Sequence, residues 1–200
     1  MLSTRFTAHS LVTEAHKSIQ PYLSKQSIAI DATMGNGHDT LFLARHCQHV
    51  YAFDIQADAL TATQARLEKN KHHAAVTLIH AGHENMQQSI PAGEKADAII
   101  FNLGYLPHAD PHIITQQKST LSALNQALQL LSPKGILSIL AYPGHSGGES
   151  ELQAVMGWYT QLNPTEFAIS IVHSMQAQAD SPRLFTLYRG IGAKPKDNIP

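Results

Sequence analysis

Two aspartates that each end an apolar segment are the residues whose types and spacing most clearly indicate chemistry. Asp31 precedes a turn that contains Gly35 and Gly37, and Asp54 ends the next apolar segment of the chain. Glycines allow a tight turn and a close approach to a ligand, and a helix that starts after such a turn leaves backbone N–H groups unpaired. This pattern predicts a loop that holds a nucleotide-like cofactor.

The loop residues favour one cofactor over another. A dinucleotide-binding loop has a third glycine in the pattern G-x-G-x-x-G, and this chain has Thr40 at that position. A carboxylate ahead of the loop suits a cation. S-adenosylmethionine (SAM) carries a sulfonium and an ammonium but no phosphate, so Asp31 favours SAM over NAD.

Asp54 has two interpretations. A carboxylate at the end of the second strand can accept hydrogen bonds from both hydroxyls of a ribose, which SAM and NAD share. It could also cap the helix that follows. The glycine loop upstream favours the ribose interpretation.

Composition predicts a single domain over residues 1–200. Hydrophobic residues make up 43% and charged residues 14% of the chain, so neither disorder nor a coiled coil is indicated. Its single cysteine, Cys47, excludes an internal disulfide and a C-x-x-C site. There is no signal-peptide pattern and no segment near the roughly 20 apolar residues of a membrane span. We expect a cytoplasmic protein with no membrane partner.

The net charge of −1 argues against a broad electrostatic surface for nucleic acid. A local basic face stays open, because residues 69–73 contain two lysines and two histidines. A solvated helix end is the more ordinary interpretation of that cluster.

Strands and helices alternate along the chain, which is typical of a parallel sheet with helices on both faces. The expected strands are 27–32, 49–53, 76–80, 96–102, 136–141, 167–173 and 184–189. The expected helices are 9–22, 39–46, 57–70, 120–131 and 149–162, with a turn at 132–135. Seven strands with a closing hairpin predict an α/β, Rossmann-like class I methyltransferase fold with a mostly parallel sheet.

The segment after the third strand could contact the adenine of a cofactor. His83 and Glu84 could donate to or accept from the edge of the base, but together with Asn85 they could equally cap a short helix.

Asn102 and Tyr105 follow the fourth strand. In methyltransferases that act on nitrogen, a related Asn/Asp-Pro-Pro-Tyr/Phe segment binds the target nitrogen and stacks on a planar substrate. Leu103 and Gly104 replace the prolines here. We therefore expect Asn102 and Tyr105 to hold a nitrogen nucleophile, with a turn around a buried asparagine as the alternative.

Histidines raise two further hypotheses. His145, in the glycine-rich loop after the fifth strand, titrates near neutral pH and could accept a proton from an ammonium nucleophile, or could simply be solvated. The pairs His80/His83 and His108/His112 have metal-compatible spacing, but no third ligand has a recognisable spacing. We expect no metal site.

Five segments, taken together, resemble the rRNA methylase family: 31–44, 53–56, 82–85, 101–107 and 142–148. They occur in order over most of the chain. The resemblance implies a SAM-dependent methyltransferase whose cofactor lies at Asp31, Thr33, Gly35, Asn36, Gly37, Asp39, Asp54, Gln56, His83 and Glu84. Asn102, Tyr105 and His145 are then the expected catalytic residues.

The same resemblance implies a substrate. The family includes an enzyme that methylates the aminomethyl group of 5-aminomethyl-(2-thio)uridine at the tRNA wobble position, so the anticodon region of tRNA is the expected partner. A small-molecule N-methyltransferase, an rRNA methyltransferase and an NAD-linked protein remain as alternatives. A second copy could extend the RNA-binding surface, which leaves a homodimer open.

Overall fold

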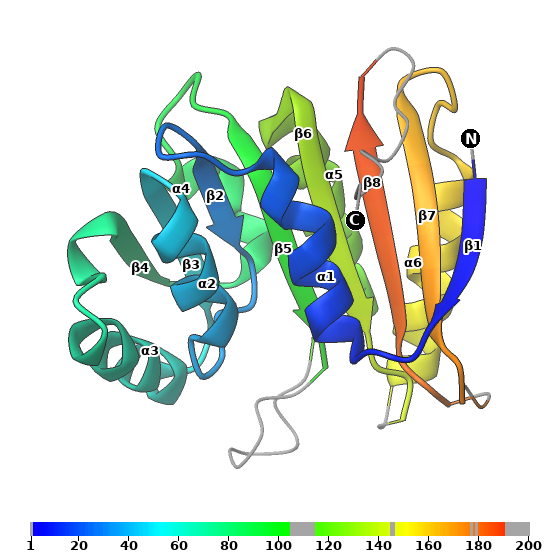
Figure 1. Ribbon diagram of the computed structural model, residues 1–200, viewed down its shortest axis with the longest axis horizontal. Helices are drawn as coiled ribbons and strands as arrows, with labels where there is room; N and C mark the ends of the chain where they lie inside the picture. The colour runs from blue at the N-terminus through cyan, green and yellow to red at the C-terminus, as the bar shows by residue number, and fades with distance from the viewer. Residues whose placement is uncertain (1, 105–114, 145–146, 177, 179, 191–200) are drawn as a thin grey trace.

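The computed structural model describes residues 2–104, 115–144, 147–176, 178 and 180–190. Eight strands form one sheet in the order β1-β7-β8-β6-β5-β2-β3-β4 (Figure 1). The strands are β1 Leu2–Thr7, β2 Ile28–Asp31, β3 His49–Asp54, β4 Val76–His80, β5 Ala96–Leu103, β6 Leu131–Ala141, β7 Phe167–Ser174 and β8 Arg183–Arg189. β8 is antiparallel to both of its neighbours, and every other pairing is parallel.

The α-helices are α1 Leu11–Ile19, α2 His38–His46, α3 Ala57–Lys69, α4 Met86–Ser89, α5 Gln117–Leu130 and α6 Gly148–Thr160. Short 3-10 helices are η1 Gln20–Tyr22, η2 His73–Ala75 and η3 His83–Asn85. None of the helices in the described ranges is long and apolar enough to cross a membrane.

The expectation of seven strands is wrong by one, because β1 adds an eighth strand at the edge of the sheet. β1 pairs in parallel with β7, from Leu2 opposite Ile169 to Thr7 opposite Ser174. Five of its six residues are exposed, so the strand is held mainly by backbone hydrogen bonds. A strand that buries almost none of its side chains leaves little apolar alternation in the sequence, which is the signal that identified the other strands.

Helices cover both faces of the sheet, as expected. α1, α2 and α3 lie on one face, where Leu43 of α2 and Leu67 of α3 join a core that includes Ile100 of β5 (Figure 1). α5 and α6 lie on the other, where Leu124 and Val155 pack in the core that includes Phe101. Ile100 and Phe101 are neighbours in β5 and face opposite cores, because side chains alternate across a strand.

The expected turn at 132–135 lies inside β6 as an irregularity. Leu131 pairs with Ala96, but the next pair along the ladder joins Ile136 to Ala98, so β6 contains extra residues opposite a short step of β5. The Ser132 hydroxyl donates to Asp97 Oδ1 at 3.0 Å across this irregularity. The predicted turn is therefore replaced by a bulge-like irregularity within a strand that begins at Leu131, five residues before the predicted start.

The order in which the chain adds strands to the sheet reverses between β2 and β5. From β2 the chain continues to β3 and β4 on one side, and β5, β6 and the closing hairpin lie on the other side. In open α/β sheets, ligands bind beside the carboxyl ends of the strands at this switch point. Asp31, Asp54 and Asn102 all lie at these ends.

Candidate active site

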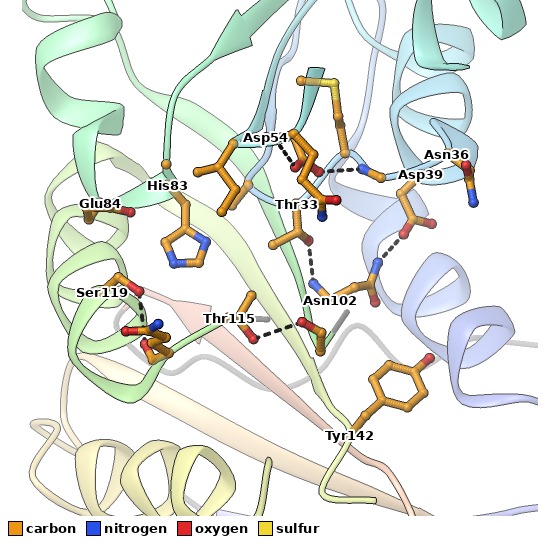
Figure 2. Close-up of a pocket in the computed structure, with 18 of the residues that line it drawn as sticks. Thr33, Asn36, Asp39, Asp54, His83, Glu84, Asn102, Thr115, Ser119 and Tyr142 are labelled. Atoms are coloured by element: carbon orange, nitrogen blue, oxygen red, sulfur yellow. Dashed lines mark hydrogen bonds between the residues drawn. The ribbon is translucent and has the colours of Figure 1, made fainter. Parts of the chain in front are cut away.

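A cavity of about 600 Å³ lies at the carboxyl ends of β2, β3, β4 and β5. Nine residues predicted from the sequence line it: Thr33, Gly35, Asn36, Asp39, Asp54, Gln56, His83, Glu84 and Asn102 (Figure 2). Two other predicted residues, Asp31 and Gly37, are absent from the described lining of the cavity. Tyr105 and His145 lie outside the described residues. We call the part lined by Asp54 and Gln56 the Asp54 end, and the part lined by Asp39, Asn102 and Tyr142 the Asn102 end.

Asp31 lies beneath the glycine loop and is 0% exposed. Its carboxylate accepts hydrogen bonds from the Thr33 backbone N–H at 3.2 Å and from the Thr40 hydroxyl at 2.6 Å. Burial, followed by the nearby charges of Asp39 and Asp54, raises the pKa of Asp31 to about 7, although the two hydrogen bonds act in the opposite direction. Asp31 therefore supports the loop and acts on the cavity through its charge.

Asp54 binds the loop from the side. One of its carboxylate oxygens accepts from the Gly35 N–H at 3.0 Å, and the other accepts from the Gln56 N–H at 3.0 Å. A carboxylate oxygen has more than one lone pair, so these bonds leave it able to accept from a ligand in the cavity. Asp54 thus fixes the loop and still faces the cavity.

The loop is also anchored to α3. The Thr63 hydroxyl donates to the Gly35 carbonyl at 3.0 Å, and Arg66 Nε donates to the Asn36 carbonyl at 2.6 Å. Gly37 has φ +75°, and a Cβ built on it would lie 2.9 Å from the Thr63 Cα. Both the backbone conformation and the contact with α3 therefore favour a glycine at this position.

His83 presents an unpaired nitrogen at the cavity. His83 is 7% exposed, and its ring has a hydrogen bond with the Ala32 backbone and lies 5.7 Å from the Phe101 ring. Burial lowers the pKa of His83, so the ring is neutral at pH 7. Its buried Nε2 has no hydrogen-bond partner among the described residues. A neutral imidazole that donates from one nitrogen to a carbonyl accepts at the other, so Nε2 can accept from a ligand N–H.

Asp39 and Asn102 meet at the Asn102 end. The Asn102 amide nitrogen donates to one Asp39 oxygen, and His16 Nε2 lies 2.5 Å from the other (Figure 2 shows the first bond). The Asn102 backbone N–H donates to the Thr33 hydroxyl at 2.7 Å. The end of β5 is therefore tied to the glycine loop and to α2.

Several lining residues were not predicted from the sequence: Val12, His38, Thr115, Gln116, Ser119 and Tyr142. Tyr142 directly follows the buried strand β6, and Asp31 and Asp54 end their own strands, so a rule based on strand ends could have found it. Its backbone N–H donates to the Leu103 carbonyl at 3.2 Å, and burial followed by the charge of Asp39 raises its pKa. Val12 and His16 lie on α1, which precedes β2, and no local sequence motif indicates that they belong to the site.

The histidines do not form a recognisable metal site in the part of the chain that the structure describes. No three His, Cys, Asp or Glu side chains there are grouped as metal ligands. His80 Nε2 lies 2.9 Å from the Ile55 carbonyl oxygen, and His83 faces the cavity instead. His108 and His112 lie outside the described residues.

The fold and the position of the cavity define a class I methyltransferase domain, and solved structures bear this out. A crystal structure of a "putative methyltransferase" from Streptococcus mutans, in complex with SAH, is 36% identical, with a TM-score of 0.84 over 92% of this chain and 99% of that one. A "putative rRNA-methylase" from Clostridium thermocellum is 31% identical, with a TM-score of 0.87 over 92% of this chain and 100% of that one.

The chain belongs to the family described as "Putative rRNA methylase", whose pattern matches residues 50–188. A curated relative is the "tRNA (mnm(5)s(2)U34)-methyltransferase, chloroplastic" of Arabidopsis thaliana, 38% identical over 152 residues. The match covers 70% of this chain and 56% of the relative, so the chain spans little more than half of that protein's length. The expected family and the expected SAM-dependent methyltransferase class are both confirmed.

Proposed function

We propose that this protein transfers a methyl group from SAM to the amine of 5-aminomethyl-(2-thio)uridine at the wobble position of tRNA, giving 5-methylaminomethyl-(2-thio)uridine. The name of the Arabidopsis relative supports the substrate. The observation that carries the proposal is the Asn102 amide at the cavity, held by Asp39 so that its oxygen is available to a nitrogen nucleophile. A tRNA anticodon loop can present such an aminomethyl group to an open cavity.

The residues of the Asp54 end fit SAM. Asp54 can accept from the two ribose hydroxyls while it still accepts from the loop N–H groups. The unpaired His83 Nε2 suits the amino group of an adenine, which needs an acceptor. Beneath the loop, the carboxyl group of Asp31 supplies negative charge for a cationic cofactor when it is ionised. We assign Thr33, Gly35, Asn36, Gln56 and Glu84 to the same cofactor, and Gly37 to the shape of the loop.

Bound SAM would supply an electrophilic methyl group on a sulfonium. The task of the protein is then to hold a neutral amine in line with that methyl group and to exclude water, which can supply much of the rate. Asn102 would bind the amine by its side-chain oxygen, and Tyr142 lies next to it at the Asn102 end (Figure 2). We keep Tyr105 as the residue that stacks on the uracil and His145 as the proton acceptor, both as proposals from the sequence.

The decisive experiment is mass spectrometry of nucleosides from undermodified tRNA that has been incubated with the protein and labelled SAM. The expected product is labelled 5-methylaminomethyl-(2-thio)uridine at the wobble position. Label in rRNA but not in tRNA would replace the substrate with rRNA. Label in small molecules of an extract that survives ribonuclease treatment would instead support a small-molecule N-methyltransferase.

Three expectations about the whole protein stay predictions: one domain over residues 1–200, a cytoplasmic location and a homodimer. The Arabidopsis relative is named as chloroplastic, which concerns that protein. Size-exclusion chromatography with light scattering, with and without an anticodon stem-loop, would determine the oligomeric state.

A further inference from the structure

Three side chains from three elements form a chain of hydrogen bonds beside the cavity. His16 of α1 reaches one oxygen of Asp39, and Asn102 of β5 reaches the other. An ionised carboxylate can only accept hydrogen bonds, so both neighbours must present an N–H group to it. His16 Nε2 therefore carries a hydrogen, and the Asn102 amide has its NH₂ group toward Asp39.

This orientation of the amide determines which atom of Asn102 can contact a substrate. With Nδ2 engaged by Asp39, Oδ1 is the atom left for the nucleophile. An oxygen accepts from an amine N–H and leaves the nitrogen lone pair free to attack a methyl group. A flipped amide would present its NH₂ group, which would bind that lone pair and block the attack.

We propose that His16 is a positioning residue for methyl transfer, which holds Asp39 and thereby keeps Asn102 Oδ1 toward the substrate. The proposal rests on the proposed function, in which Asn102 contacts the amine. It also narrows the substrate class, because the site takes a nucleophile with an N–H group to donate, as a primary amine has, and discriminates against a tertiary amine.

The surroundings of His16 hold its ring in place. The ring stacks on Phe42 of α2, with centroids 3.9 Å apart and planes 2° from parallel. Val12 lies one helical turn before His16 and lines the cavity, so this face of α1 is directed at the site. The side chain of His16 is 26% exposed and that of Asp39 is 12% exposed. Partly exposed contacts between polar side chains contribute little to folding, so the contact should matter more for orientation than for stability.

Four variants separate the hydrogen bond from the ring stacking. His16→Ala removes both, His16→Phe keeps a ring against Phe42, and His16→Gln keeps an N–H group for Asp39. His46→Ala is the matched control, because His46 also contacts Phe42, with ring centroids 4.9 Å apart. Each variant is assayed for kcat and KM on an anticodon stem-loop with 5-aminomethyluridine, and for SAM affinity by calorimetry.

His16→Ala and His16→Phe should lower kcat by about 10- to 100-fold, the range for a misplaced reacting group, and change SAM affinity less than twofold. His16→Gln should recover most of kcat, and His46→Ala should match the parent. The double variant His16→Ala/Asn102→Ala should be no slower than Asn102→Ala alone. The proposal fails if His16→Gln is as slow as His16→Phe. It also fails if the loss of kcat in the double variant is the product of the losses in His16→Ala and Asn102→Ala.

A second measurement does not depend on activity. The side-chain NH₂ signal of Asn102, identified by its loss in Asn102→Ala, is followed by ¹⁵N NMR in the SAH complex. Slow hydrogen exchange in the parent and His16→Gln, with at least tenfold faster exchange in His16→Ala and His16→Phe, would support the proposal. Equal exchange rates in the parent and in the three His16 variants would overturn the proposal. If the parent fails to methylate the stem-loop, the proposed function fails while this measurement still decides the role of His16.

Discussion

The two ends of the cavity use carboxylates in different ways. At the Asp54 end, Asp54 accepts from backbone N–H groups of Gly35 and Gln56, and beneath the loop Asp31 accepts from that of Thr33. At the Asn102 end, Asp39 accepts from the side chains of His16 and Asn102, which are 23 and 63 positions away in the chain. Asp54 and Asp31 thus accept mainly from backbone N–H groups, with the Thr40 hydroxyl as a further donor, whereas both of these bonds to Asp39 come from side chains of distant elements.

This difference indicates a division of labour. Backbone N–H groups are present whatever the side chain, so the carboxylate of Asp54 depends on the shape of the turn more than on the identity of its partners. The Asn102 end depends on the identity of each partner, because replacement of one group changes the direction of the next. We therefore expect the first end to govern cofactor affinity and the second to govern rate, and the following changes test that separation.

Asp54→Ala should have the largest effect. It removes the acceptor for the loop N–H groups and for the ribose, and hydrogen bonds to a charged group contribute roughly 1.5–3 kcal/mol each. SAM affinity, measured by calorimetry, should fall by about 10²-fold or more. The matched control is Asp58→Ala, an exposed aspartate in the first turn of α3, which should bind SAM as the parent does. A similar loss in both variants would contradict a specific role for Asp54.

Asn102→Ala should separate the two ends most clearly. We expect a loss of about 10²-fold in kcat, the low end for a positioned catalytic group, with SAM affinity unchanged. Single-turnover methylation of the stem-loop, at saturating SAM, measures the rate. An equal loss of SAM affinity would move Asn102 to the cofactor site and remove the distinction between the ends.

The same contrast explains how much of the site the sequence could predict. Asp31, the glycine turn and Asp54 belong to a continuous pattern of strand, turn, helix and strand, so residue types and order were enough to predict that both aspartates end neighbouring strands. His16 contacts Asp39 only because α1 packs against α2, and that packing is a tertiary event with no local motif. β1 was missed for a related reason, because its exposed side chains leave no apolar pattern.

The charge of Asp31 should make SAM binding depend on pH. Folding raises the pKa of this group from 3.8 to about 7, so its protonated form is favoured in the folded protein and its contribution to the free energy of unfolding declines as the pH rises from about 4 to 7. A cationic cofactor favours the ionised form. SAM affinity should therefore rise between pH 6 and pH 8, by at most about tenfold for each pH unit below 7.

Calorimetry with SAM and SAH at these pH values tests this dependence, because SAH lacks the sulfonium charge and should bind with a flatter profile. Asp31→Asn keeps an oxygen for the Thr33 N–H and should flatten the SAM profile. Parallel profiles for SAM in the parent and in Asp31→Asn would assign the pH dependence to another group.

Gly37→Ala should have the smallest effect on methyl transfer. It tests whether the shape of the loop alone sets the affinity for SAM. The φ of +75° costs a residue with a Cβ about 1–2 kcal/mol, and the new methyl group would meet the Thr63 backbone at 2.9 Å. We expect a lower melting temperature and SAM binding weakened by about tenfold, with kcat at saturating SAM retained. Gly157→Ala is the control, because its Cβ would meet nothing within 4 Å and alanine favours the helix. If Gly37→Ala instead lowers kcat at saturating SAM, the loop also positions the nucleophile, through the bond from the Asn102 N–H to Thr33, and the two ends act as one unit.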